Sequence, residues 1–121
     1  MQRKQMQDYE TTWRNFRWEI PKYFNFAVNV VDYWAQDQDK LALIWCNQAG
    51  EERRYTFADV SRLSSQVANL LASSGLVKGD KVIVMLPRIP EWQIVMVGCL
   101  RMGVIPIPSV TMLTEKDLDY R

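Results

Sequence analysis

The sequence contains no histidine, and its only cysteines, Cys46 and Cys99, lie far apart in apolar segments. A chain without histidine cannot supply a Ser-His-Asp triad or a histidine general base. Two cysteines at this separation do not match the ligand spacing of a zinc site, and we interpret them as reduced thiols of the core. The sequence therefore predicts no metal site and excludes histidine-dependent catalysis within these 121 residues.

Long apolar runs and basic clusters are also missing. The longest apolar run covers residues 94–100, far fewer than the ~20 residues that a membrane-spanning helix needs. Fifteen Lys and Arg residues balance fourteen Asp and Glu residues, and no basic run is longer than two residues. Such a charge pattern offers no footprint for a nucleic acid. We expect neither a membrane span nor a nucleic-acid partner.

The first ten residues lack an apolar segment and include Asp8 and Glu10, so they do not resemble a secretory signal. Acidic residues this early also argue against a mitochondrial transit peptide, although several basic residues lie nearby. We therefore expect a cytoplasmic protein, with the mitochondrial matrix as the alternative location.

What the chain does contain is an ordinary globular composition, 48% hydrophobic and 24% charged, and a series of local structural signals. Tyr9, Trp13 and Phe16 share one face of a predicted short helix. Asn25 is a predicted N-cap for a helix from residue 26 to about residue 36. We expect the aromatic residues of this N-terminal stretch to fill a core or to dock on a larger body.

A β-hairpin and a long amphipathic helix come next. Residues 41–46 and 51–55 flank a loop that contains Gly50, and the polar character of the second strand places it on a surface or at a sheet edge. Thr56 and Asp59 approximate a capping box. Gly75 lies where a left-handed residue would end the helix. The apolar stripe of this helix consists of Val60, Leu63, Val67, Leu70 and Leu71.

The second half of the chain predicts a βαβ unit. Residues 81–86 form a continuous apolar strand, which is typical of a strand covered on both faces. Pro90 suits the first position of a helix that Gly103 ends. Residues 104–107 then form the next strand, parallel to the first. The expected fold class is α/β.

The helix over residues 90–102 has apolar residues at every angle around its axis, which indicates a helix buried on all sides. A small domain hides only ~60–70% of its unfolded surface, so this chain offers little material for such burial. Thr114 and Asp117 repeat the capping signal about two turns before the last residue. We expect a chain that is incomplete on its own and a parent protein that continues beyond it.

Ser109 and Thr111 are the candidate binding residues. They follow the strand over residues 104–107, and ligands of α/β sheets gather at the carboxyl ends of parallel strands. The alternative is a connector whose hydroxyl groups satisfy nearby backbone groups. Arg88 is a weaker candidate for contact with an anionic cofactor, against a surface or capping role. We interpret Trp45 and Trp92 as packing residues.

Taken together, these segments resemble the beginning of the adenylate-forming superfamily, and more narrowly the medium-chain-type acyl-CoA synthetases. The string LPRIPEW and the early FNFA favour the synthetase branch, whereas the other segments recur across the superfamily. All of them belong to the scaffold. The resemblance covers about residue 9 to the last residue, in segments 24–27 (FNFA), 55–59 (YTFAD), 79–82 (GDKV), 85–92 (MLPRIPEW), 98–103 (GCLRMG), 106–108 (PIP) and 118–121 (LDYR).

The resemblance implies an AMP-forming ligase that joins a carboxylic acid, of medium chain length or similar, to coenzyme A through an acyl-adenylate. ATP, Mg²⁺ and coenzyme A are the implied cofactors of the full-length parent, and we expect none of them to bind tightly to this stretch alone. It also implies an N-terminal extension at residues 1–23 and a partial AMP-binding domain at residues 24–121. The Ser/Thr/Gly-rich phosphate loop of the family is absent, so we expect no catalytic residue in this chain.

Two other functions stay open at this point. One is a non-enzymatic partner-binding module, or a split subunit derived from a synthetase, which the expected exposure of an all-apolar helix would favour. The other is an adenylation domain whose acceptor is a carrier protein instead of coenzyme A, because the quoted segments do not distinguish the two acceptors.

Overall fold

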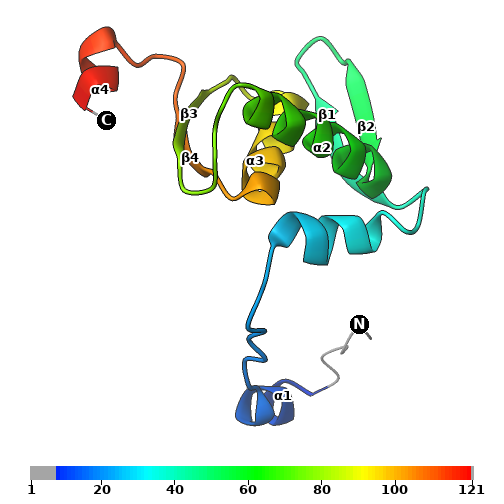
Figure 1. The fold of residues 1–121 in the computed structure, drawn as a ribbon. Helices are drawn as coiled ribbons and strands as arrows, with labels where there is room; N and C mark the ends of the chain where they lie inside the picture. Colours follow the sequence, from blue (N-terminus) through cyan, green and yellow to red (C-terminus); the bar gives the residue numbers. More distant parts are fainter. Residues whose placement is uncertain (1–7, 121) are drawn as a thin grey trace.

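The computed structural model describes residues 8–120, so residues 1–7 of the predicted extension and Arg121 lie outside the description. Figure 1 shows α2 and α3 side by side between two small sheets, with α1 and α4 at the ends of the chain and away from this body. In chain order the elements are α1 (Tyr9–Asn15), the π-helix η1 (Ala27–Asp32), β1 (Leu41–Cys46), β2 (Glu52–Thr56), α2 (Phe57–Ser73), β3 (Lys81–Met85), α3 (Pro90–Met102), β4 (Ile105–Ser109) and α4 (Glu115–Tyr120).

The first sheet is the predicted hairpin. β1 and β2 pair antiparallel, with Ile44 opposite Arg54 and Cys46 opposite Glu52, and the register shifts between Leu41 and Leu43. Most of β2 is exposed, which confirms that its polar sequence forms a surface strand. The hairpin packs against the body through its contacts with α2.

The capping box that the sequence predicts is present at the start of α2. The Asp59 backbone N–H donates to the Thr56 hydroxyl over 3.1 Å, and the Thr56 N–H donates to the Asp59 carboxylate over 3.1 Å. Gly75 follows the helix at φ +88°, as predicted. The predicted apolar stripe is wrong at one position, because Leu70 is 65% exposed near the end of the helix.

Replacing Thr56 with alanine is expected to lower the free energy of unfolding by about 1 kcal/mol, because the Asp59 backbone N–H in the first turn loses the hydroxyl that accepts its hydrogen bond. A urea titration followed by tryptophan fluorescence would measure this loss. Thr56→Ser keeps the hydroxyl and should retain most of the stability. Equal losses in both variants would show that the hydroxyl does not contribute to the cap.

The second sheet pairs β3 with β4 in parallel, from Lys81 opposite Ile105 to Met85 opposite Ser109. With α3 between them in sequence, these strands form the predicted βαβ unit. The expectation that residues 81–86 are covered on both faces is wrong for the described chain, because Ile83 and Met85 are 41% and 39% exposed. The reason is that α3 packs against the strands, while no described element covers their other side.

The prediction that α3 is buried on all sides is likewise only partly correct. Ile94, Val97 and Cys99 are buried, and Val97 packs in the core cluster with residues of η1 and α2, but Leu100 remains 40% exposed. Gly98 is also buried and marks the closest approach to α2, since an added Cβ would lie 2.6 Å from Val67 Cγ1. Helices α2 and α3 therefore form the tightest contact of the body.

The predicted helix after Asn25 adopts π-helical geometry from Ala27 to Asp32, a form that its periodicity does not indicate. The Asn25 side chain fulfils its predicted capping role, since its Oδ1 accepts from the Ala27 N–H over 3.0 Å. Its Nδ2 also donates to the Leu100 carbonyl over 2.9 Å, which attaches η1 to the end of α3. Ala27 and Val31 complete the apolar core with α2 and α3.

A polar junction lies beside this core and joins η1, α2 and α3. Arg101 donates two hydrogen bonds to the Asp32 carboxylate, over 2.7 and 2.8 Å, and the Ser61 hydroxyl donates to the same carboxylate over 2.6 Å. The hydrogen bonds from Arg101 hold the pKa of Asp32 below its ordinary value, against the opposing effect of burial. We call Asp32, Arg101 and Ser61 the polar junction.

The two terminal helices are short and exposed. Asp8 caps α1 by accepting from the Glu10 N–H over 3.1 Å, and Thr114 donates to Asp117 at the predicted start of α4. Tyr9, Trp13 and Phe16, which the sequence predicts to share one helix face, are 52–67% exposed in the described chain, so they do not enter its core. Among residues 8–120, no helix combines the length and the apolar character that crossing a membrane requires.

Candidate functional site

The carboxyl ends of β3 and β4 lie at one edge of the parallel pair. Met85 and Ser109 are paired at the last position of both strands, so the segments that follow them leave the sheet side by side. Ligands of α/β sheets bind outside this kind of edge. The loop after Met85, which contains Arg88, and the segment that contains Thr111 therefore both start at this edge of the sheet.

Ser109 lies within β4 and not in the loop where the sequence placed it. The strand runs from Ile105 to Ser109, and the Ser109 side chain is buried, with its hydroxyl donating to the Ile107 carbonyl over 3.3 Å. The strand continues past Ile107 although Pro108 has no backbone N–H. In the described chain β4 is an edge strand, so no hydrogen bond between strands is lost at Pro108. This hydrogen bond matches the alternative in which the hydroxyl satisfies a backbone group.

Thr111 lies in the turn after β4 and is exposed. The two candidates thus occupy different environments, one in the sheet and one at the surface. Their role in binding stays a prediction. Among residues 8–120, no group of three or more Cys, Asp or Glu side chains has the arrangement of a metal site.

A hollow of 370 Å³ lies beside the same edge, between the hairpin and the start of α3. Its volume falls within the ~300–1,000 Å³ of typical small-molecule pockets. The apolar walls come from β1, from the loop after β3 and from the first turn of α3. These walls consist of Leu43, Trp45, Leu86, Ile89 and Trp92.

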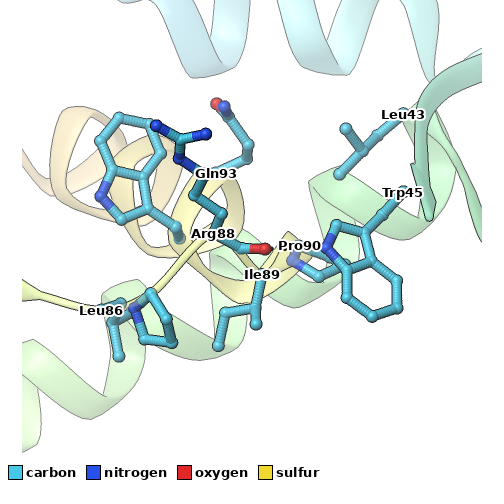
Figure 2. A pocket seen from close by; sticks show the side chains of 9 residues that line it. Leu43, Trp45, Leu86, Arg88, Ile89, Pro90 and Gln93 are labelled. Carbon is cyan, nitrogen blue, oxygen red and sulfur yellow. Dashed lines mark hydrogen bonds between the residues drawn. The ribbon is translucent and has the colours of Figure 1, made fainter. Parts of the chain in front are cut away.

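One hydrogen bond fixes the width of this hollow. The Trp45 indole Nε1 donates to the Arg88 carbonyl over 2.8 Å, and the dashed line in Figure 2 marks this bond. It joins the hairpin to the loop that precedes α3. Because the donor is an indole on a strand and the acceptor is backbone, the two walls are held at a defined separation.

Two polar side chains, Arg88 and Gln93, stand together on one side of the hollow, and Leu43 and Trp45 face them from the other side (Figure 2). A neighbouring arginine, Arg53, already has an aromatic and a carboxylate partner. Arg53 lies 5.2 Å from the centre of the Trp45 ring and 3.5 Å from the Glu91 carboxylate. Arg88 has no carboxylate partner within 4.0 Å among residues 8–120.

Sequence reasoning missed this hollow. It interpreted Trp45 and Trp92 as packing residues and considered Arg88 separately, so it did not bring these three residues together around one cavity. Local signals carry no information on where the hairpin lies against α3, because Trp45 and Arg88 are 43 positions apart. The only available signal was an arginine between two prolines at the end of a predicted strand.

Comparison with known proteins places this architecture in a family. A family model described as AMP-binding enzyme matches residues 31–121. The chain is 43% identical to the human mitochondrial acyl-coenzyme A synthetase ACSM3 over 94% of its length, and 42% identical to human ACSM5 over 84%. These alignments cover 21% and 19% of the two relatives, so the chain spans about a fifth of their length.

Solved structures give the same result. The crystal structure of an acyl-CoA synthetase from Brucella canis superposes with a TM-score of 0.81 at 25% identity, covering 93% of this chain and 22% of that protein. A fatty acid AMP ligase from Legionella pneumophila gives a TM-score of 0.69 at 26% identity, covering 77% and 16%. The α/β fold is therefore that of the N-terminal part of these enzymes, and the chain belongs to the family of AMP-binding enzymes.

Proposed function

We propose that the chain is the N-terminal part of an AMP-forming acyl-CoA synthetase. The parent would activate a medium-chain or similar carboxylic acid with ATP to an acyl-adenylate and would transfer the acyl group to coenzyme A. The observation that carries this proposal is the 43% identity over 94% of the chain to a relative named as an acyl-coenzyme A synthetase. The coverage of 93% against the Brucella canis synthetase, compared with 77% against the Legionella pneumophila AMP ligase, also supports the synthetase branch.

The residues of this chain do not fit the nucleotide. Binding Mg·ATP requires backbone N–H groups in a phosphate-binding loop and oxygen ligands for the metal. The five glycines stand at positions 50, 75, 79, 98 and 103 and form no such loop, and the described residues hold no acidic cluster. We therefore assign no catalytic step to these residues. The contribution that we assign to this chain is scaffold, namely the βαβ unit and the helices that support it.

We expect the 121-residue chain to show no tight binding of Mg·ATP and no thioester formation, because the phosphate loop and the metal ligands are missing from it. Isothermal titration calorimetry with Mg·ATP and an assay for octanoyl-CoA would measure both. A dissociation constant in the micromolar range would contradict the assignment. The coding DNA beyond codon 121 offers an independent check, since the proposal requires an open frame that reaches a Ser/Thr/Gly-rich loop ending in Pro-Lys.

The partner-binding alternative is favoured by the apolar surface that the described chain exposes. Ile83 and Met85 on β3 and Leu100 on α3 are each about 40% exposed. In the main proposal the remainder of the synthetase covers this surface. In the alternative a separate chain does. Size-exclusion chromatography of a split pair, with the second chain supplied in trans, would distinguish the two.

The likeness to the Legionella pneumophila AMP ligase keeps an acceptor other than coenzyme A as a further alternative. Domain limits and location are also proposals. We assign residues 1–23 to an extension and residues 24–121 to a partial AMP-binding domain, compared with a family match that starts at residue 31. We propose the cytoplasm as the location, with the mitochondrial matrix as the alternative that the names of the curated relatives favour.

A further inference from the structure

Large apolar side chains are exposed throughout residues 9–23, which we call the aromatic segment. Besides the three aromatic residues of the α1 region, Trp18, Ile20 and Tyr23 are 81–83% exposed. Figure 1 shows α1 and the chain that follows it standing away from the body that α2 and α3 form. Exposed apolar surface concentrated in one stretch is typical of a surface that binds a partner.

The types of residue in the aromatic segment favour a lipid surface as this partner. Tryptophan and tyrosine carry a polar N–H or O–H on an apolar ring, and they gather where a membrane meets water. The segment holds two tryptophans and two tyrosines, interleaved with Arg14, Arg17 and Lys22. Arginine and lysine can lay their apolar stems on such a surface while the charged group stays in water.

The conformation of the segment points in the same direction. α1 ends at Asn15, and the rest of the segment is not helical. The segment therefore does not present the single helical face that a groove on a protein partner would receive. A fluid bilayer surface needs no such face, because its headgroups rearrange around each side chain.

Charge is distributed unevenly along the chain, and the positive excess lies at the aromatic end. Residues 1–23 contain five basic and three acidic residues, whereas residues 24–121 contain ten basic and eleven acidic residues. Arg14 pairs with Glu10 at 3.5 Å, but among residues 8–120 neither Arg17 nor Lys22 has a carboxylate within 4.0 Å. Arg17 donates to backbone carbonyls of its own segment, and Lys22 lies 5.4 Å from the centre of the Tyr23 ring. Both cations are therefore available to an anionic headgroup.

We propose that the aromatic segment attaches the protein peripherally to a bilayer that contains anionic phospholipid. Trp13 and Trp18 enter the boundary between headgroups and acyl chains, and Arg17 and Lys22 contact the headgroups. The inference goes beyond the proposed function and does not rest on it, because the match to the family model begins at residue 31, after this segment.

The test is sedimentation of the 121-residue chain with vesicles of phosphatidylcholine that contain about one third phosphatidylglycerol. We expect the chain to partition into these vesicles about tenfold or more strongly than into phosphatidylcholine alone, since each basic residue near an anionic surface adds to the attraction. Raising the salt concentration to about 1 M, where the Debye length is about 3 Å, should remove most of this difference.

Replacing both tryptophans, with Trp13→Ser and Trp18→Ser, should weaken partitioning about tenfold or more, because the largest apolar side chains of the segment are lost. Val110→Ser with Met112→Ser is the matched control. It removes two apolar side chains that are 59% and 85% exposed but lie outside the segment. This control should partition as the original chain does, and circular dichroism would verify the fold of each variant.

The charge contribution has its own variant. Arg17→Gln with Lys22→Gln should reduce the preference for anionic over neutral vesicles about tenfold, while binding to phosphatidylcholine alone stays unchanged. Arg54→Gln with Arg62→Gln is the control, because both arginines are exposed and lie in β2 and α2. This pair should leave the preference as it is in the original chain.

Three outcomes would overturn the proposal. The first is the absence of partitioning into the anionic vesicles, or equal partitioning into anionic and neutral vesicles. The second is an equal loss in the tryptophan variant and in the Val110 and Met112 control, which would mean general adsorption of exposed apolar surface. The third is a dimer in analytical ultracentrifugation without vesicles that the tryptophan variant does not form, which would assign the segment to a second copy of the chain.

Discussion

Replacing Asp32 with alanine is expected to lower the free energy of unfolding by about 2 kcal/mol. The change removes the acceptor of two hydrogen bonds from Arg101 and one from Ser61, and it leaves a guanidinium whose side chain is only 17% exposed without its counter-ion. Breaking a fully buried pair costs about 3–5 kcal/mol. We discount that range because the Asp32 side chain is 34% exposed and solvent screens part of the interaction.

A urea titration followed by tryptophan fluorescence would measure the loss. Glu52→Ala is the matched control, because it breaks the surface pair of Glu52 with Arg54, whose side chains are 48% and 64% exposed. Such a pair should contribute about 0.5 kcal/mol or less. Replacing both members of the buried pair, with Asp32→Leu and Arg101→Met, should recover part of the stability. A loss below that of Glu52→Ala would disprove a stabilising role for the polar junction.

The pH dependence of stability provides a second measurement on the same pair. The pKa of Asp32 is lower in the folded chain than its ordinary value near 3.8, chiefly because of the hydrogen bonds from Arg101. The folded state therefore binds the proton less readily, so the stabilisation is complete above the ordinary pKa and is lost as the pH falls through the folded value. Unfolding free energy should decrease below about pH 4.

In Asp32→Ala the free energy of unfolding should decrease less steeply with falling pH than in the original chain. It should not vanish, because the pKa of Asp59 is also lowered, mainly by its hydrogen bond from the Thr56 backbone. Combining Asp32→Ala with Asp59→Asn should make the dependence of unfolding free energy on pH below about pH 4 weaker still. An unchanged slope in Asp32→Ala would mean that the carboxylate of Asp32 titrates alike in the folded and unfolded chain.

The features that the sequence predicted correctly depend on contacts between residues close in the chain. The capping box joins Thr56 to Asp59, and Pro90 and Gly103 mark both ends of α3. Each of these signals involves backbone groups within one or two turns. For that reason the hairpin, α2, and the βαβ unit could be predicted without knowledge of how they pack.

The features that could not be predicted depend on pairs distant in sequence. Asp32 and Arg101 are 69 positions apart, and neither residue differs locally from an ordinary surface charge. The same holds for the bond from Trp45 to Arg88 that shapes the candidate site. Burial of β3 was overestimated because apolar composition shows that a strand avoids water but does not say which chain segment covers it.

Gly98 shows a further limit of prediction from sequence. In the apolar run of residues 94–100 it is neither apolar nor polar, so the pattern assigns it no role. In the structure it is buried at the crossing of α2 and α3, where an added Cβ would lie 2.6 and 2.7 Å from two atoms of Val67 and 3.0 Å from the Ser64 carbonyl. The function of this glycine is to let two helices approach. Periodicity cannot identify it, since the partner helix begins more than thirty positions earlier.

Gly98→Ala should therefore destabilise the chain by about 1–3 kcal/mol, the usual cost of overpacking a core. Helix propensity predicts the opposite sign, because alanine in a helix is favoured over glycine by about 1 kcal/mol. The sign of the change in unfolding free energy therefore shows whether the close packing of the two helices or the helix propensity of alanine dominates at this position. Urea unfolding of the variant would measure it, with Gln66→Ala on the exposed side of α2 as the control, expected within about 0.5 kcal/mol of the original chain.

A double-mutant cycle with Val67→Ala tests the physical cause. Removing the two methyl groups of Val67 takes away Cγ1, the atom nearest the added Cβ, although the contacts with the Cβ of residue 67 at 2.7 Å and with the Ser64 carbonyl at 3.0 Å remain. Gly98→Ala should then cost less in the Val67→Ala background than in the original chain, with a coupling energy of about 1 kcal/mol. Additive losses would mean that the Cβ of residue 67 and the Ser64 carbonyl, and not the methyl groups of Val67, set the spacing of α2 and α3. A gain in stability from Gly98→Ala by itself would show that the two helices do not meet at this glycine.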